Sequence, residues 1–357
     1  MNNLHLYHKV LRQICQWQPQ ERITRCRNAA LLIVGLHLSG AVHLSHITRK
    51  WPVVGKAPSL VNRLRRFLNN ERVAVAEWYR PVAQQMMKGF AGQTIRLIID
   101  CTKVGFNHRM LMVSVAYRKR SLPLVWRVYR GSKGHIGHQE QIALLKMVKT
   151  LLPPGCPIEI TADAGFESVN LMAWLSRQHW YFVIRLAGRT KIRSQAQDWV
   201  KLNQLGVQAG QTLDAGWVRL TQQHDYGWVY LVVHWAKGED EPWYLVANRP
   251  ASSRHIIRMY KRRMWVEEMF GDMKGHGFDL ETTYLDDPDR ISRLVLGVCI
   301  AYVWLIALGS WVVKSGYRHF IDLKSRRDKS YFRLGWDWLE RCLLHQMPIP
   351  LRFIPVL

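Results

Sequence analysis

The stretch TIRLIIDCTKV, residues 94–104, decides the fold class of this chain. Its β-branched and apolar run is typical of a buried strand, and the run meets an aspartate at Asp100. The segment before it, residues 1–90, has helical periodicity, whereas the segments after it return to short apolar runs. The change of period therefore predicts a helical N-terminal domain followed by a core that is built on a β-sheet.

Apolar runs and amphipathic segments follow one another in the next part of the chain. HRMLMVSVAYRKRSLPLVWRVYRG (residues 108–131) predicts two strands around a basic turn, and PIEITADAGF (157–166) and YFVIRLAGRTKI (181–192) predict further strands. Amphipathic helices are expected over residues 138–155 and 169–180. Strands in succession, followed by strands that alternate with helices, are typical of a mixed α/β fold.

Changes in composition along the chain predict its domain boundaries. We expect a helical DNA-binding domain over residues 1–90, a first part of the α/β core over 91–190, a β-rich insertion over 191–242, a second part of the core over 243–315, and a basic helical region over 316–357.

The charge of the chain points to a polyanionic partner. Lys and Arg number 51 against 26 Asp and Glu, so the formal net charge is +25, and a surplus of this size is costly without an anion to neutralise it. Nucleic acid is the first candidate and an anionic membrane surface the second. Residues 1–99 hold 15 Lys and Arg but three acids, and Arg63 and Arg66 lie in a stretch whose apolar residues predict a helix with one face on a core. We therefore expect these two arginines to contact DNA phosphates rather than only solvent.

Two further features limit the class of protein. The six cysteines are scattered and form no CxxC pair, which argues against a zinc ribbon or a disulfide framework and favours a reduced, cytoplasmic protein. The segment Leu294 to Val313 is twenty residues without a charge. By length it could cross a membrane, but a buried core helix has the same composition, and both interpretations stay open here.

Acidic residues are scarce, so their positions are informative. Asp100 and Asp163 are the first two aspartates of the chain, and each lies at the end of an apolar strand, LIID and EITAD. An aspartate in such a place is often a turn former or a helix cap. However, the ends of central strands are also where the sites of α/β proteins gather, so both residues are candidates for catalysis.

A third carboxylate lies in YKRRMWVEEMFGDMKGHG, residues 260–277. On a helix with about 100° per residue, the side chains of Tyr260, Arg263, Glu267 and Lys274 form one polar stripe roughly 60° wide. Glu268 should point elsewhere. A salt bridge from Arg263 to Glu267 at i,i+4 would account for one pair in this stripe but not for all four residues.

A carboxylate that binds a metal, beside cations that hold a phosphate backbone, accounts for the whole stripe. Asp100, Asp163 and Glu267 could together hold two Mg²⁺ or Mn²⁺ ions, since hard oxygen ligands and phosphate substrates suit these metals. A pair of such ions can activate an attacking oxygen and stabilise a leaving one.

These motifs resemble the DDE transposases of bacterial insertion sequences. Tyr260, Arg263, Glu267 and Lys274 match the signature Y-x2-R-x3-E-x6-K of the insertion-sequence-four family with its spacing intact, and IIDCTKV and TADAGF are similar to the family's two aspartate segments. The 103 residues between Asp163 and Glu267 fit the β-rich insertion of that family.

The resemblance implies an RNase H-like core, with a β-rich insertion, that carries out cut-and-paste transposition. Asp100, Asp163 and Glu267 would hold the metals, water would cleave double-stranded DNA at the element ends, and the freed 3′-OH would attack target DNA, in some relatives through a hairpin. Residues that would contact DNA are Tyr260, Arg263, Lys274, Arg185 and Arg189.

The resemblance also implies a second copy of the chain as a partner, and two alternative functions stay open. Two element ends must be brought together, so a homodimer is expected, with no membrane involved. The family stacks a flipped base on an aromatic side chain, and Trp199, Trp217, Trp228 and Trp235 lie in or near the insertion. The alternative functions are a catalytically inactive DNA-binding repressor and a basic membrane-associated protein.

Overall fold

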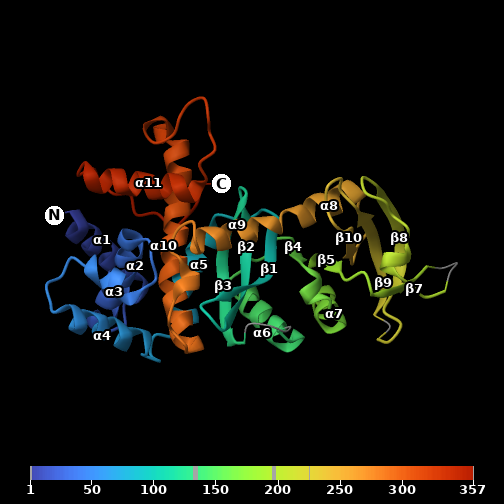
Figure 1. Ribbon diagram of the computed structural model, residues 1–357, viewed down its shortest axis with the longest axis horizontal. Coiled ribbons are helices and arrows are strands. Elements are labelled where there is room, and N and C mark those ends of the chain that lie inside the picture. The colour runs from blue at the N-terminus through green and yellow to red at the C-terminus, as the bar shows by residue number, and fades with distance from the viewer. Residues whose placement is uncertain (1, 132–135, 195–197, 225, 357) are drawn as a thin grey trace.

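The computed structural model describes residues 2–131, 136–194, 198–224 and 226–356 (Figure 1). Helices of the N-terminal segment gather at one end of the molecule, the central sheet lies in the middle, and strands β8 and β9 lie at the other end (Figure 1). The long helix α10 (Pro288–Lys314) lies between the N-terminal helices and the sheet.

The centre of the molecule is a mixed sheet. Its first five strands in spatial order are β3 (Arg120–Arg130), β2 (His108–Tyr117), β1 (Ile95–Val104), β4 (Ile158–Ala162) and β5 (Tyr181–Leu186). β2 is antiparallel to β1 and β3, whereas β4 is parallel to both β1 and β5. The predicted mixed α/β core is confirmed.

The sheet continues beyond β5 through β10 (Trp243–Ala247), which is antiparallel to it. Next come the strands from the segment between β5 and β10: β9 (Gly227–His234), β8 (Thr212–Leu220), β6 (Lys191–Arg193) and β7 (Val200–Lys201). The residues predicted to be a β-rich insertion therefore extend the same sheet rather than forming a second one.

Helices surround the sheet and fill the N-terminal end. The N-terminal helices are α1 (Asn2–Trp17), α2 (Ile23–Ser39), α3 (Leu44–Arg49), α4 (Ala57–Leu68) and α5 (Val75–Lys88). The later ones are α6 (His138–Lys149), α7 (Val169–Arg177), α8 (Ser253–Lys261), α9 (Met264–Met273) and α11 (Tyr331–Leu344). Short 3-10 helices cover Ala164–Phe166, Leu202–Gln204, Leu280–Thr282 and Tyr317–Phe320.

Helix α10 contains the apolar segment that was long enough to cross a membrane. It is the one helix in the described ranges that meets the length and composition of a membrane span, and 94% of its most apolar window is buried inside the protein. It crosses α11 closely, because a Cβ added at Gly309 would lie 1.9 Å from the Tyr331 carbonyl oxygen. Burial among neighbouring helices accounts for the apolar composition of this segment.

The structure corrects one expectation about the signature helix. The sequence predicts one continuous helix through Tyr260 and Lys274, whereas α8 ends at Lys261 and α9 begins at Met264. The backbone N–H of Val266 donates to the carbonyl oxygen of Arg263 at 3.0 Å, three residues back. Such tighter turns change the direction of a helix without a proline or a glycine, and periodicity does not reveal them.

Candidate active site

Arg263 lies in the break between α8 and α9 and faces the sheet. Its Nη1 lies 2.5 Å from Oδ2 of Asp100, and the two side chains are 13% and 6% exposed. The other oxygen of Asp100 accepts a hydrogen bond of 2.7 Å from the backbone N–H of Cys101. Burial raises the pKa of Asp100 to about 7, while the Arg263 cation acts in the opposite direction. A buried carboxylate of this kind requires a cation beside it.

The two adjacent glutamates of α9 point to different partners. Glu267 is half exposed, and its Oε1 lies 3.5 Å from Nη1 of Arg263. Glu268 pairs instead with Arg120 of β3, at 2.8 Å. Therefore only Glu267 shares a cation with Asp100, and the expectation that Glu268 points elsewhere is confirmed.

Asp163 follows β4 and lies close enough to affect the charges of this group. Its Oδ1 accepts a hydrogen bond of 2.9 Å from the backbone N–H of Gly165, so it also caps the short helix that follows. Its negative charge raises the pKa of Asp100. Burial lowers the pKa of Arg263, whereas the negative charges of Asp100, Asp163 and Glu267 raise it. The net result is a raised pKa of Arg263.

Three carboxylates are suitable ligands for a divalent metal ion, but in this structure the guanidinium of Arg263 is the cation that contacts two of them. Within the described ranges no three His, Cys, Asp or Glu side chains stand close enough together to hold a metal ion. The guanidinium of Arg263 contacts both Asp100 and Glu267. Carboxylate oxygens are the ligands that Mg²⁺ and Mn²⁺ prefer. A metal here would therefore compete with Arg263 for the same oxygens.

Two other residues of the predicted stripe lie at the edges of this group. The Tyr260 side chain is 2% exposed and packs edge-on against the Trp243 ring, with centroids 5.0 Å apart. Lys274 follows α9, and its Nζ lies 2.7 Å from Oε1 of Glu281. Their roles in DNA binding stay predictions.

The remaining predicted DNA contacts lie on other elements. Arg185 of β5 pairs with Glu241, and Arg189 is 79% exposed with its Nη2 3.8 Å from Glu167. Arg63 donates to Oδ1 of Asn28 at 2.7 Å, so it joins two helices. Arg66 is exposed on α4, in the last turn. None of these four arginines contacts the three carboxylates, and their roles also stay predictions.

The tryptophans of the β-rich segment differ in exposure. Trp217 of β8 and Trp228 of β9 are 42% and 46% exposed, and the Trp217 ring lies edge-on to Tyr230 at 5.8 Å. Trp199 and Trp235 are partly buried, and Trp235 donates its ring N–H to the carbonyl oxygen of Glu239. Of these four tryptophans, only Trp217 and Trp228 are exposed.

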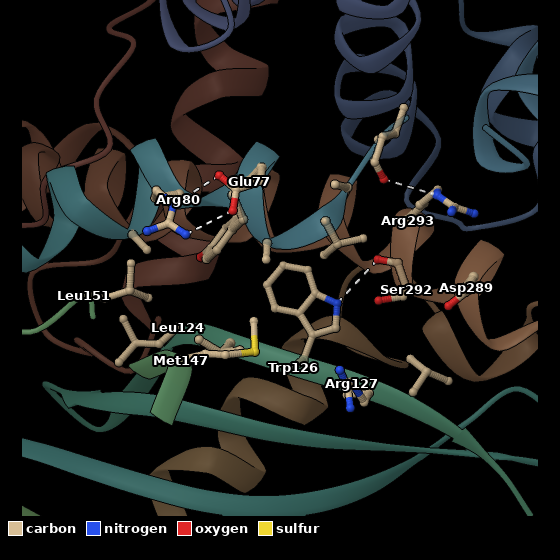
Figure 2. A pocket seen from close by; sticks show the side chains of 18 of the residues that line it. Glu77, Arg80, Leu124, Trp126, Arg127, Met147, Leu151, Asp289, Ser292 and Arg293 are labelled. Carbon is tan, nitrogen blue, oxygen red and sulfur yellow. Dashed lines mark hydrogen bonds and ion pairs between the residues drawn. The ribbon is translucent and has the colours of Figure 1, made fainter. Parts of the chain in front are cut away.

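A separate cavity of about 560 Å³ lies between α5, β3, α6 and the start of α10. Figure 2 shows the Trp126 ring in its middle, with the ring N–H directed at the carbonyl oxygen of Ser292, 3.4 Å away. None of the three carboxylates lines it. The cavity is therefore not part of the candidate active site.

Sequence reasoning missed the residues that hold α9 against the sheet. Arg120 places its Nε 2.7 Å from Oδ2 of Asp272, and its Nη1 reaches Glu268. Burial raises the pKa of Asp272 to about 6, and Arg120 acts in the opposite direction. Asp272 lies four residues after Glu268, on the same helix face, and this spacing was the available signal.

Comparison with known proteins identifies the family. Residues 94–304 match the model of the transposase DDE domain, which is more than half of the chain. The chain belongs to the transposase DDE-domain family. The protein is therefore a transposase, and members of this family are enzymes that cleave nucleic acid.

The transposase has no match among curated proteins. Among solved structures, it is similar to a cryo-EM structure of a piggyBac transposase synaptic complex with hairpin DNA. That likeness covers 97% of this chain and 80% of the other, with 11% sequence identity and a TM-score of 0.44.

Proposed function

We propose that this transposase cleaves double-stranded DNA at the ends of an insertion sequence and joins the freed 3′-OH to target DNA. The observation that carries the proposal is the meeting of Asp100 and Glu267 on Arg263, with the charge of Asp163 close by. Asp100 in the middle of β1 and Glu267 on α9 thereby share one guanidinium group, and Asp163 directly follows β4. The spacing Y-x2-R-x3-E-x6-K supports membership of the insertion-sequence-four group.

The active site would hold two Mg²⁺ or Mn²⁺ ions through Asp100, Asp163 and Glu267. When bound, such ions supply a Lewis acid for in-line displacement at phosphorus. Asp100 would supply the most buried carboxylate and Glu267 the most accessible one. Arg263, released from these carboxylates, would bind a phosphate of the DNA end.

The remaining parts of the chain would serve DNA binding and assembly. The order β3-β2-β1-β4-β5, with only β2 antiparallel to its neighbours, supports an RNase H-like core. We assign residues 1–90 to a DNA-binding domain, 191–242 to the family's insertion and 316–357 to a basic C-terminal region. A homodimer in the cytoplasm, with two ends held together, would carry out the reaction, with or without a hairpin.

The alternative functions find less support. An inactive DNA-binding repressor would have no need for the three carboxylates, and the membrane hypothesis rested on a segment that is buried in α10. Cleavage of a DNA duplex that carries the element end, with Mg²⁺ and with Mg²⁺ replaced by EDTA, tests the proposal. Asp100→Asn and Asp163→Asn should each abolish cleavage. Cleavage by either variant at the parent's rate would refute it.

A further inference from the structure

A second group of cations lies on the other side of the α8–α9 break. Arg262 and Arg263 are adjacent, but Arg262 places its Nη1 3.9 Å from Oε2 of Glu159, whereas Arg263 reaches Asp100. Glu159 is paired in the sheet with Arg96, and their side chains lie 3.0 Å apart. The break in the helix therefore directs two neighbouring arginines to two different places on the sheet.

The two places are on one face of the sheet but well separated. Arg96 and Asp100 are four residues apart on β1, so both side chains point to the same face, about 13 Å from one another. Glu159 lies near the start of β4, whereas Asp163 directly follows the end of this strand. One phosphate group cannot contact both places, because it spans only a few ångströms.

Positive charge is in large excess around Glu159. Arg96 and Arg262 face its carboxylate, and the His255 ring lies 3.9 Å from its Oε1. Arg258 is exposed one turn before Arg262, and in the described part of the chain no carboxylate pairs with it. Burial and the charge of Arg96 lower the pKa of Arg262, and Arg258 acts in the same direction.

A fourth arginine extends this group. The guanidinium of Arg249 lies 4.7 Å above the Tyr181 ring, and the His255 ring stacks against Tyr181 at 6.2 Å. Tyr181 is paired in the sheet with Glu159. Two arginines, Arg96 and Arg262, thus face the Glu159 carboxylate, while Arg258 acts on Arg262 and Arg249 covers the neighbouring Tyr181 ring. We name Arg96, Arg249, Arg258 and Arg262 the α8 basic cluster.

The pairing inside the cluster also leaves donor groups unused. Nε of Arg96 and Oε2 of Glu159 are both buried, yet the two side chains are not aligned for a hydrogen bond despite their short distance. The Arg96 side chain is still 41% exposed. Guanidinium groups that are partly open and electrostatically uncompensated are suited to bind phosphate oxygens.

We propose that the α8 basic cluster binds the phosphate backbone of the target duplex, while the carboxylates act on the element end. This inference rests on the proposed function and deepens it. Transposition brings two DNA molecules to one active site, and the α8–α9 break offers a cationic site on each side of it. On this surface α8 contributes Arg258 and His255, and a guanidinium group can bind the oxygens of one phosphate in a bidentate way. Phosphate contacts carry no sequence information, which suits a target of variable sequence.

Charge reversal at exposed members of the cluster tests this inference. Arg249 and Arg258 are both exposed, so the double variant Arg249→Glu/Arg258→Glu should fold. A matched control is Lys149→Glu, because Lys149 and Arg258 are each basic residues in the last turn of a helix. Joining of a pre-cleaved element end to a plasmid measures target use, and cleavage of an uncut end measures the other reaction.

We expect the double variant to lose at least about tenfold in joining, with end cleavage within about twofold of the parent and no effect of Lys149→Glu. Lower salt should enlarge the difference in joining between the parent and the double variant, since each lost phosphate contact reduces the salt slope of log K by about 0.9. Equal losses in cleavage and joining, or no loss in joining, would overturn the inference.

Failure of the proposed function gives a different result. In that case the parent itself neither cleaves nor joins DNA, and anisotropy with a labelled duplex of unrelated sequence remains as the test of the cluster. Arg249→Glu/Arg258→Glu should then weaken binding of this duplex relative to Lys149→Glu. Equal affinity of the two variants would show that the cluster does not bind DNA backbone.

Discussion

Arg263 and Asp100 form a buried ion pair of 2.5 Å between residues 163 positions apart in the chain. The pair joins the break between α8 and α9 to the middle of strand β1. Because Glu267 contacts the same guanidinium, one arginine links the strand and the helix that carry two of the three carboxylates. The geometry of the proposed active site therefore depends on this pair.

Separate substitution of the two adjacent glutamates, Glu267 and Glu268, distinguishes a catalytic role from a packing role. Glu267→Gln should reduce end cleavage by about 100-fold or more, because it removes a carboxylate of the active site. Its effect on stability should be small, since the side chain is 51% exposed. Glu268→Gln should leave cleavage almost unchanged and cost at most about 1 kcal/mol, because the Glu268 side chain is 57% exposed in its pair with Arg120. Cleavage assays and urea unfolding measure both effects, and the reverse pattern would contradict the assignment.

Lys274 has a protein partner that allows a paired test. If Lys274 binds the DNA end, Lys274→Ala should weaken binding of the end. Glu281→Gln should leave binding unchanged or strengthen it, because it removes the carboxylate 2.7 Å from the Lys274 ammonium. Anisotropy with a labelled end duplex measures both. Equal weakening by the two variants would indicate that the pair only holds the loop after α9 in place.

Much of the core could be predicted from the sequence because its signals are local. The apolar runs before Asp100 and Asp163 specify buried strands, and Asp163 directly follows the end of β4 as expected. The expected strand end at Asp100 is wrong, because β1 continues past this residue to Val104. The separate directions of Glu267 and Glu268 also follow from helix geometry alone.

The remaining features depend on contacts between distant segments. The break at Arg263 is held by Asp100, which periodicity within the helix cannot reveal. The anchoring of α9 by Arg120 depends on the position of β3 in the sheet. The burial of α10 likewise follows from the helices around it, and an apolar segment looks the same in a membrane and in a core.

Tyr260 is buried in spite of its place in the signature. Its hydroxyl is buried without a well-formed hydrogen bond, and its ring packs on Trp243. Tyr260→Phe should therefore change cleavage by less than about threefold and leave stability nearly unchanged. Tyr260→Ala should cost about 3–5 kcal/mol, as for other large buried side chains. Thermal unfolding and cleavage assays test this, and a large loss of DNA binding in Tyr260→Phe would instead assign the hydroxyl to DNA.

Arg63 and Arg66 lie on the same helix but should respond differently to substitution. Arg66 is exposed, so Arg66→Gln should leave stability unchanged and reduce the salt slope of DNA binding by about 0.9. Arg63→Gln should reduce the salt slope in the same way and, in addition, lower the free energy of unfolding by about 1 kcal/mol, since Arg63 donates to Asn28 on α2. Binding titrations at several salt concentrations, together with urea unfolding, measure both. An unchanged slope in Arg66→Gln would remove this residue from the DNA interface.

Asp272 should make stability depend on pH. Its side chain is 5% exposed and faces Arg120, and burial raises its pKa to about 6. Glu268, His276 and the buried Tyr302 hydroxyl also lie near this group. In the unfolded chain an aspartate titrates near pH 4. Between about pH 4 and pH 6 the folded protein therefore binds a proton that the unfolded chain has lost, and the free energy of unfolding falls as the pH rises through this window.

Asp272→Asn removes this dependence, because asparagine does not titrate. Relative to the parent, the variant should gain up to about 3 kcal/mol in free energy of unfolding between pH 4 and pH 7. Asp240→Asn is the control, since it removes a carboxylate that is exposed rather than buried. Urea unfolding at several pH values, in buffer without divalent metal, measures these differences. Parallel pH profiles for the parent and Asp272→Asn would show that Asp272 stays ionised in the folded protein, with its charge fully compensated by Arg120.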